Sequence, residues 1–121
     1  KLLAPSGFRV YAGSEVFLMR TLRAGGVGCI SATANVNPFA IADLTAHWRE
    51  TNADERQAAL DKVRSVFAKY QMIAGMKTAV AHFSNDPEWL RVRPPLMQLS
   101  PEQQAQLLNE LKQINFTMPG L

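Results

Sequence analysis

The sequence predicts an α/β fold built around a strand, helix, strand unit, and three observations support this. Residues 8–12 and 28–32 are short apolar runs rich in β-forming residues, each with a glycine beside it. The residues between them have the spacing of an amphipathic helix. A helix joining two strands in this order makes them parallel, with a right-handed crossover. We therefore expect both runs to be buried strands of one parallel sheet.

The helix of this unit has a start signal and a stop signal. Ser14 can cap its beginning, and Gly25-Gly26 can end it. Its predicted apolar positions are Val16, Phe17, Met19 and Leu22. In parallel sheets the groups that meet ligands lie on the loops after the carboxyl ends of the strands. A site is therefore expected at residues 13–15 and 32–35.

The chain after the second strand reads as helical almost throughout. Asn37-Pro38 provides an N-cap and a first-turn proline for one helix. Ser100-Pro101, with Gln103 three residues after the serine, predicts a capping box for another. The apolar stripes of three predicted helices are Ile41, Leu44, Thr45 and Trp48; Ala59, Leu60, Val63, Val66, Phe67 and Tyr70; and Leu107, Leu108, Leu111 and Ile114.

Composition and charge are those of an ordinary globular protein. The chain is 47% hydrophobic and 19% charged, and it has no run of about 18 apolar residues, so no membrane role is predicted. The net charge of +3 comes from residues that alternate in sign along the helices, which argues against nucleic-acid binding. One cysteine, Cys29, excludes an internal disulfide and suits the cytoplasm, the default localisation. His47 and His82 lack ligand spacing, so no metal site is predicted.

Three segments carry a resemblance to a known family. The runs AGSE at 12–15, GGVGCISATANVNP at 25–38 and VRPPL at 92–96 resemble the C-terminal region of the dihydrodipicolinate synthase and N-acetylneuraminate lyase family. The resemblance covers nearly all 121 residues and implies a (β/α)8 TIM barrel, which needs about 250 residues. We therefore expect residues 1–51 to be the last two β/α units of a barrel and residues 52–121 a C-terminal helical extension. The other six units are expected upstream of Lys1.

The same resemblance implies an activity. The family forms a Schiff base between a lysine and pyruvate and makes or cleaves a carbon–carbon bond with an aldehyde. That lysine and the proton-relaying tyrosine lie on earlier strands, so no catalytic residue is expected in this chain. No cofactor and no metal are implied. The implied partners are pyruvate, an aldehyde or 2-keto acid, the rest of the barrel, and further copies in a homotetramer, for which Trp89 and Leu90 are candidate contacts.

The implied contribution of this chain is part of the substrate pocket. By position, Ile30 matches the family residue whose backbone lies against pyruvate, and Ser31 follows it in the same main chain. Gly13, Ser14 and Glu15 match the loop that selects the second substrate. Synthases making dihydrodipicolinate often carry two acidic residues after that glycine, so Ser14 departs from their pattern. A carboxylate at Glu15 suits either a polyhydroxylated 2-keto acid or an amino-aldehyde.

Simpler interpretations stay open beside these. Ser14 and Glu15 also suit a helix N-terminus, and Thr33, Asn35 and Asn37 suit local turns. Lysines are expected on solvated helix surfaces, at Lys62, Lys69, Lys77 and Lys112. Two alternatives to the lyase or synthase remain: a dehydratase or hydratase-aldolase of the same family, and a non-catalytic remnant.

Overall fold

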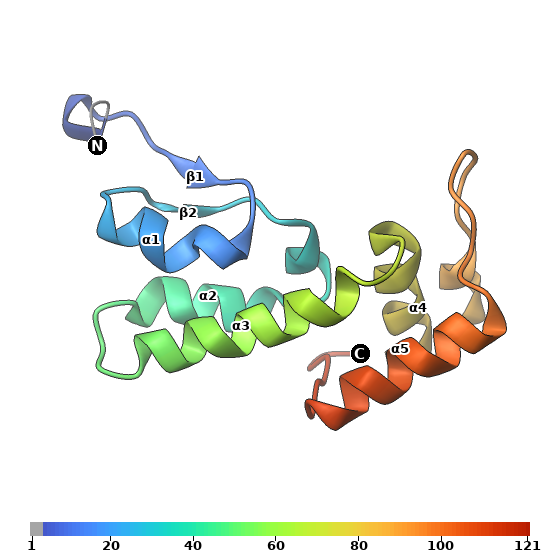
Figure 1. Ribbon diagram of the computed structural model, residues 1–121. Coiled ribbons are helices and arrows are strands. Elements are labelled where there is room, and N and C mark those ends of the chain that lie inside the picture. Colours follow the sequence, from blue (N-terminus) through green and yellow to red (C-terminus); the bar gives the residue numbers. More distant parts are fainter. Residues whose placement is uncertain (1–3) are drawn as a thin grey trace. The chain divides into compact units, whose positions relative to one another are not determined.

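The computed structural model describes residues 4–121 (Figure 1). Residues 1–3, where the first predicted domain starts, lie outside the described residues. The chain divides into two compact units, one ending at Asp61 and the other beginning at Lys62. The division falls inside one helix, and the predicted domain boundary after residue 51 stays a prediction.

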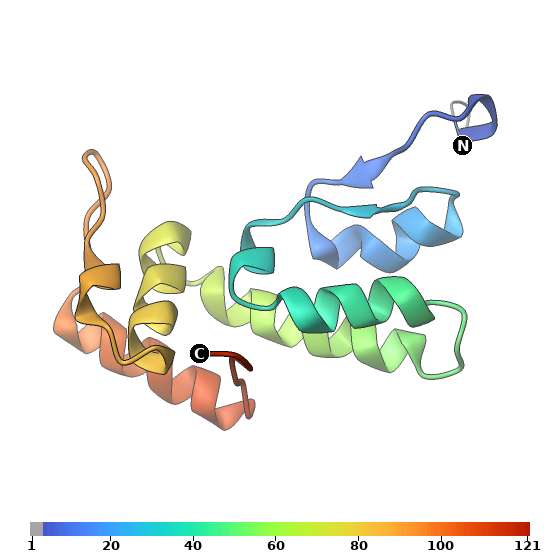
Figure 2. The same ribbon diagram turned by 180° about the vertical axis from the view of Figure 1, so that it is seen from behind.

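The first unit contains a parallel two-stranded sheet. Strand β1, Tyr11–Ala12, pairs in parallel with β2, Gly28–Cys29, after a short 3₁₀ helix η1, Ala4–Ser6. Two further main-chain bonds extend the pairing, from the Val27 amide to the Val10 carbonyl oxygen at 2.9 Å and from the Ile30 amide to the Ala12 carbonyl oxygen at 2.8 Å. Figures 1 and 2 show the two strands side by side with the connecting helix against them. The predicted strand, helix, strand unit is confirmed.

The expected length and burial of the two strands were wrong. The ladder is two residues long, and the side chains of Phe8, Tyr11 and Ile30 are 59%, 48% and 74% exposed. Within the described residues the sheet has two strands, so each strand has an edge without a neighbour. A strand pair of this size buries few side chains unless further elements pack on it.

The helix between the strands begins where the sequence predicts. A 3₁₀ turn η2, Glu15–Phe17, leads into α1, Leu18–Arg23. The hydroxyl of Ser14 accepts a hydrogen bond from the Val16 amide at 3.4 Å, which makes Ser14 the N-cap. Of the predicted apolar positions, Met19 and Leu22 are buried, whereas Val16 and Phe17, on the η2 turn, are exposed.

The end of α1 is a Schellman motif. The amide of Gly25 bonds to the Leu22 carbonyl oxygen, and that of Gly26 bonds to the Thr21 carbonyl oxygen. Gly25 has a φ of +89°, a left-handed conformation that favours glycine. The predicted glycine stop signal is confirmed.

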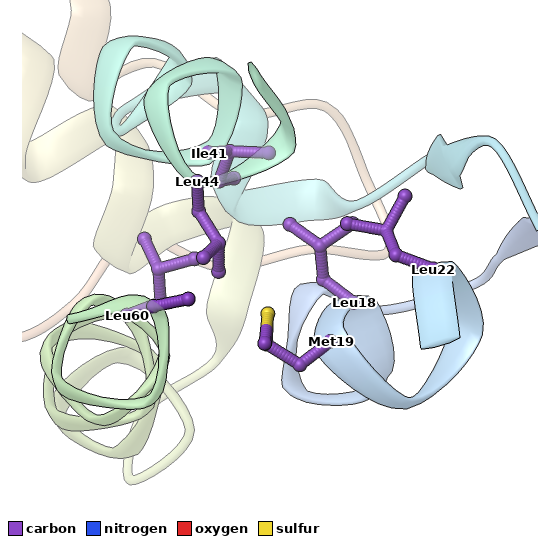
Figure 3. Close-up of a cluster of buried hydrophobic side chains, with 7 residues drawn as sticks. Leu18, Met19, Leu22, Ile41, Leu44 and Leu60 are labelled. Atoms are coloured by element: carbon purple, nitrogen blue, oxygen red, sulfur yellow. The ribbon is translucent and has the colours of Figure 1, made fainter. Parts of the chain in front are cut away.

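Two longer helices complete the core of the first unit. A 3₁₀ turn η3, Ala32–Asn35, leads into α2, Pro38–His47, and α3, Ala53–Phe67, follows. Asn37 is the N-cap residue of α2, as predicted, but its side chain makes no capping bond. Leucine, isoleucine and methionine side chains from α1, α2 and the first half of α3 converge on one another (Figure 3). The cluster consists of Leu18, Met19, Leu22, Ile41, Leu44, Ala53 and Leu60.

The second unit is helical. It holds the end of α3, then α4, Met72–Phe83, the 3₁₀ turn η4, Pro87–Leu90, and α5, Pro101–Gln113. Phe116 packs edge-on against Phe67 and Phe83, with ring centroids 6.0 and 5.8 Å away. Ser100 and Gln103 form the predicted capping box of α5. Leu107 and Leu111 are the buried residues of its apolar stripe.

The positions of the lysines and the length of the helices test two further expectations. Three of the four lysines lie on helices as expected, but Lys69 lies in the turn after α3, because that helix ends at Phe67. None of the helices described here is both long and apolar enough to cross a membrane.

Candidate functional site

A buried carboxyl group joins the loops that follow the two strands. Glu15, at the start of η2, is 1% exposed. Its carboxyl oxygens accept hydrogen bonds from the hydroxyls of Ser31 and Thr33, which follow β2 and are themselves buried. The Ser31 and Thr33 hydroxyl oxygens are 3.3 Å apart, and the Ser14 hydroxyl lies 3.3 Å from the same carboxyl group. We call Glu15, Ser31 and Thr33 the carboxyl bridge.

The carboxyl bridge lies where two parallel strands end. Gly13 and Ser14 follow β1, and Ile30 and Ser31 follow β2. The amide of Ile30 donates to the Ala12 carbonyl oxygen, so the pairing of the two strands continues to the residue just before Ser31 of the carboxyl bridge. The carboxyl ends of parallel strands share one edge of a sheet. The two loops predicted to hold the site are therefore neighbours in the structure.

Gln57 of α3 contacts the main chain of the η2–α1 turn that carries Glu15. Its side-chain amide donates to the Glu15 carbonyl oxygen at 3.0 Å and to the Asp61 carboxylate at 2.8 Å. Its side-chain oxygen accepts from the Met19 amide at 3.1 Å. One side chain thereby bonds main-chain groups on both sides of the start of α1: the Met19 amide, one of the first helical N–H groups that lack a partner within the helix, and the Glu15 carbonyl oxygen, which also accepts from the Leu18 amide.

The five predicted site residues differ in their exposure. Glu15 and Ser31 are buried in the carboxyl bridge, and Ser14 is half-buried as the N-cap. Gly13 and Ile30 are exposed, and Ile30 is 74% exposed. An added Cβ at Gly13 would meet nothing within 4 Å, so the space in front of this loop is open. Substrate contact by these five residues stays a prediction.

Cys29 lies beside the carboxyl bridge at the end of β2. It packs against the hydrophobic core and is half-buried. Burial raises the pKa of the Cys29 thiol, and the negative charge of Glu15 raises it further. A thiol with a raised pKa is a poor nucleophile at neutral pH, so Cys29 is suited to packing.

Other chemistry-bearing residues lie elsewhere. Lys77 places its ammonium 5.5 Å from the centre of the Trp89 ring. His47 Nδ1 is 2.9 Å from the Asp43 carbonyl oxygen, and His82 stacks edge-on with Phe83. No group of three or more potential metal ligands occurs among residues 4–121.

A sequence profile of the Dihydrodipicolinate synthetase family matches residues 1–114. The chain belongs to this family. It is 32% identical over 110 residues to the 4-hydroxy-tetrahydrodipicolinate synthase of Pseudomonas aeruginosa, an alignment that covers 88% of this chain and 37% of that enzyme. The chain thus spans little more than a third of the length of this relative.

Solved structures of the dihydrodipicolinate synthase family share the fold. YagE, a prophage protein of this family from E. coli K12 solved in complex with pyruvate, is 27% identical with a TM-score of 0.80 over 94% of this chain and 39% of YagE. The dihydrodipicolinate synthase of Thermotoga maritima is 26% identical with a TM-score of 0.77, over 91% of this chain and 38% of that enzyme. The chain has the fold of the C-terminal part of a (β/α)8 barrel, as predicted.

Two members of this site were not predicted in their roles. Thr33 lies in the loop 32–35 where a site is expected, and a role in a local turn stayed open for it; its burial, with 1% exposed, and its hydrogen bond to Glu15 were not predicted. Gln57 was not singled out, because an isolated glutamine on a charged helix surface carries no sequence signal. The sequence signal for Thr33 is that an acidic residue follows the first predicted strand and two hydroxyl residues lie at and just after the end of the second.

Proposed function

We propose that this chain is part of a pyruvate-dependent lyase or synthase that forms a Schiff base. The observation that carries the proposal is the joined pair of loops at the carboxyl ends of β1 and β2, in a chain that belongs to the dihydrodipicolinate synthase family. In barrel enzymes the active site is built from loops at this end of the strands. YagE, which shares the fold, was solved with pyruvate bound.

The proposed reaction begins with a lysine from outside residues 1–121. Its neutral amine attacks the keto carbon of pyruvate, water leaves, and a protonated imine forms. This imine draws electrons from the neighbouring methyl group, which loses a proton to give an enamine. The enamine carbon then bonds to an aldehyde carbonyl carbon, and water releases the product from the lysine. Cleavage is the same sequence reversed.

The proposed role of this chain is to form one wall of the pocket. The exposed main chain at Ile30 would face pyruvate, and the Gly13–Ser14 loop would face the second substrate. Loops after different strands of a barrel contribute different parts of the site, so they can change independently. Ser14, which caps η2 through its hydroxyl, is smaller and uncharged compared with the acidic residue of many synthases.

The rest of the barrel would cover the exposed side of the sheet. An open hollow on the first unit is lined by residues of the β1 segment and of η2 and α1, among them Val10, Gly13, Phe17 and Arg20. Val10 and Phe17 are 38% and 53% exposed there. A neighbouring β/α unit packed on β1 would bury them, which supports residues 1–51 as two units of a larger barrel and residues 52–121 as an extension.

We expect the complete protein to be a cytoplasmic homo-oligomer, as the family resemblance implies. Trp89 on η4 is 46% exposed, and with Leu90 it offers an apolar contact. Light scattering of the full-length protein tests this expectation, because a tetramer has four times the mass of its chain.

The experiment that tests the activity is trapping of the Schiff base. The full-length protein containing this sequence is incubated with pyruvate and borohydride, and its intact mass is measured. The proposal predicts one covalent adduct of reduced pyruvate per chain, formed only when both reagents are present. A full-length protein that gains no mass would refute the proposal and favour a non-catalytic remnant.

A further inference from the structure

The carboxyl group of Glu15 has no part in the reaction as proposed above. It is 1% exposed, and its oxygens are occupied by the hydroxyls of Ser31 and Thr33. A carboxyl group in this position does not face the open side of the loops. A buried polar network whose members are all hydrogen-bonded holds its parts in one arrangement.

The carboxyl bridge controls the main chain next to Ile30. On one side, the Ile30 amide is held by the Ala12 carbonyl oxygen at 2.8 Å. On the other side, Ser31 is held by Glu15 through its hydroxyl. The main chain of these two residues is therefore fixed at both ends, while the Ile30 side chain stays exposed.

From this geometry we infer that Glu15 is a positioning residue, which fixes the Ile30–Ser31 main chain at the pyruvate site and does not contact the second substrate. The inference rests on the proposed function and deepens it. It separates Glu15 from Gly13 and Ser14, its neighbours in the same loop, which keep the proposed role of facing the second substrate.

The chemistry of the bridge explains why a carboxylate is needed. A carboxylate accepts hydrogen bonds at both oxygens, and here both acceptors meet hydroxyl donors. In Glu15→Gln one oxygen becomes an NH₂ group, so one hydroxyl must turn away or reverse its bond. The size of the side chain is unchanged, and the main effect is on the placement of residues 31 and 33.

The first test measures the initial half-reaction alone. Full-length wild type and Glu15→Gln are mixed with saturating pyruvate and borohydride, without any second substrate, and the rate of adduct formation is followed by mass. A positioning role predicts that Glu15→Gln slows trapping about tenfold or more, because misplaced groups at a reacting centre are costly. The matched control is Glu55→Gln, the same change at an exposed position of α3, which should trap at the wild-type rate.

A second pair of variants tests the bridge through Thr33. Thr33→Val removes the hydroxyl that donates to Glu15 but keeps the shape of the side chain, and Thr33→Ser keeps the hydroxyl. The inference predicts slower pyruvate trapping in Thr33→Val and recovery in Thr33→Ser. Since Thr33 is 1% exposed, this pair changes the bridge without changing a group that a substrate can reach. Thermal melting of each variant identifies any that fails to fold.

Three results would overturn the inference. Folded Glu15→Gln that traps pyruvate at the wild-type rate but has a raised KM for the aldehyde would make Glu15 a ligand of the second substrate. If Glu15→Gln does not fold, wild-type trapping by folded Thr33→Val would overturn it equally. Wild type that forms no adduct would refute the proposed function itself, and the inference with it.

Discussion

The side-chain amide of Gln57 donates a hydrogen bond to the main-chain carbonyl oxygen of Glu15 over 3.0 Å. The two residues are 42 positions apart, and the same glutamine accepts a bond from the Met19 amide. The first half of α3 is thereby fastened to the turn that carries the carboxyl bridge. A helix assigned by sequence to the C-terminal extension thus supports a loop of the candidate site.

Replacing Gln57 by Ala should destabilise the protein by about 1–3 kcal/mol, because the part-buried Met19 amide loses its acceptor and the Glu15 carbonyl oxygen keeps only the Leu18 amide as donor. Thermal or urea unfolding of the full-length protein measures the change. Gln113→Ala, at the exposed end of α5, is the control and should stay within about 0.5 kcal/mol of wild type. Equal stability of the two variants would contradict the supporting role of Gln57.

Gly26→Ala and Gly75→Ala should have opposite effects. A Cβ on Gly26 would lie 2.3 Å from the Thr21 methyl carbon and 3.0 Å from two carbonyl oxygens. We therefore expect Gly26→Ala to lower the free energy of unfolding by about 1–3 kcal/mol. A Cβ on Gly75, inside α4, would meet its nearest neighbour at an ordinary 3.6 Å. Alanine is a better helix former than glycine, so Gly75→Ala should raise the free energy of unfolding by up to about 1 kcal/mol. Unfolding curves that rank the two variants the other way would refute this interpretation.

Glu110 of α5 should contribute a pH-dependent part of the stability. The hydrogen bond from Lys69, 2.7 Å long, is the largest cause that holds the pKa of Glu110 below its usual range. Because the folded-state pKa is lowered, the stabilisation is present above the unfolded pKa and is lost as pH falls through the folded pKa. Lys69 is more than half exposed, so the effect should not exceed about 1 kcal/mol.

The measurement for Glu110 is the stability difference between wild type and Glu110→Gln at about pH 7 and about pH 3. We expect wild type to be the more stable at neutral pH and the difference to shrink in acid. A difference that grows in acid would have the wrong sign for a lowered pKa.

Cys29 should report the charge of Glu15. Burial and the Glu15 charge both raise the pKa of its thiol, so removing the charge in Glu15→Gln should lower that pKa and speed alkylation by iodoacetamide at about pH 8. Glu55→Gln serves again as the control and should leave the rate unchanged. Slower or unchanged alkylation in folded Glu15→Gln would show that Cys29 does not sense this carboxylate.

Local signals in the sequence were good predictors of this fold. Ser14, the Gly25-Gly26 pair and the Ser100–Gln103 capping box lie where they were expected, because each depends on hydrogen bonds within a few residues. The parallel pairing of β1 and β2 followed from the helix between them. The length and burial of the two strands could not be predicted in the same way, because they depend on further strands and helices that are absent from the described residues.

The candidate site was predictable in outline and not in detail. Its location followed from the strand ends, and Glu15 and Ser31 were both singled out. That they bond to each other, with Thr33 as the third member, depends on how two loops 16 to 18 residues apart meet. Gln57 approaches from a separate helix, and nothing in its local sequence marks it.

Peptide mapping of the full-length protein after pyruvate and borohydride treatment locates the residue that binds pyruvate. We predict one modified peptide, with reduced pyruvate on a lysine outside residues 1–121. This chain would then form one wall of the pocket and would not carry the nucleophile. An adduct on Lys62, Lys69, Lys77 or Lys112, or none at all in a folded full-length protein, would contradict that account.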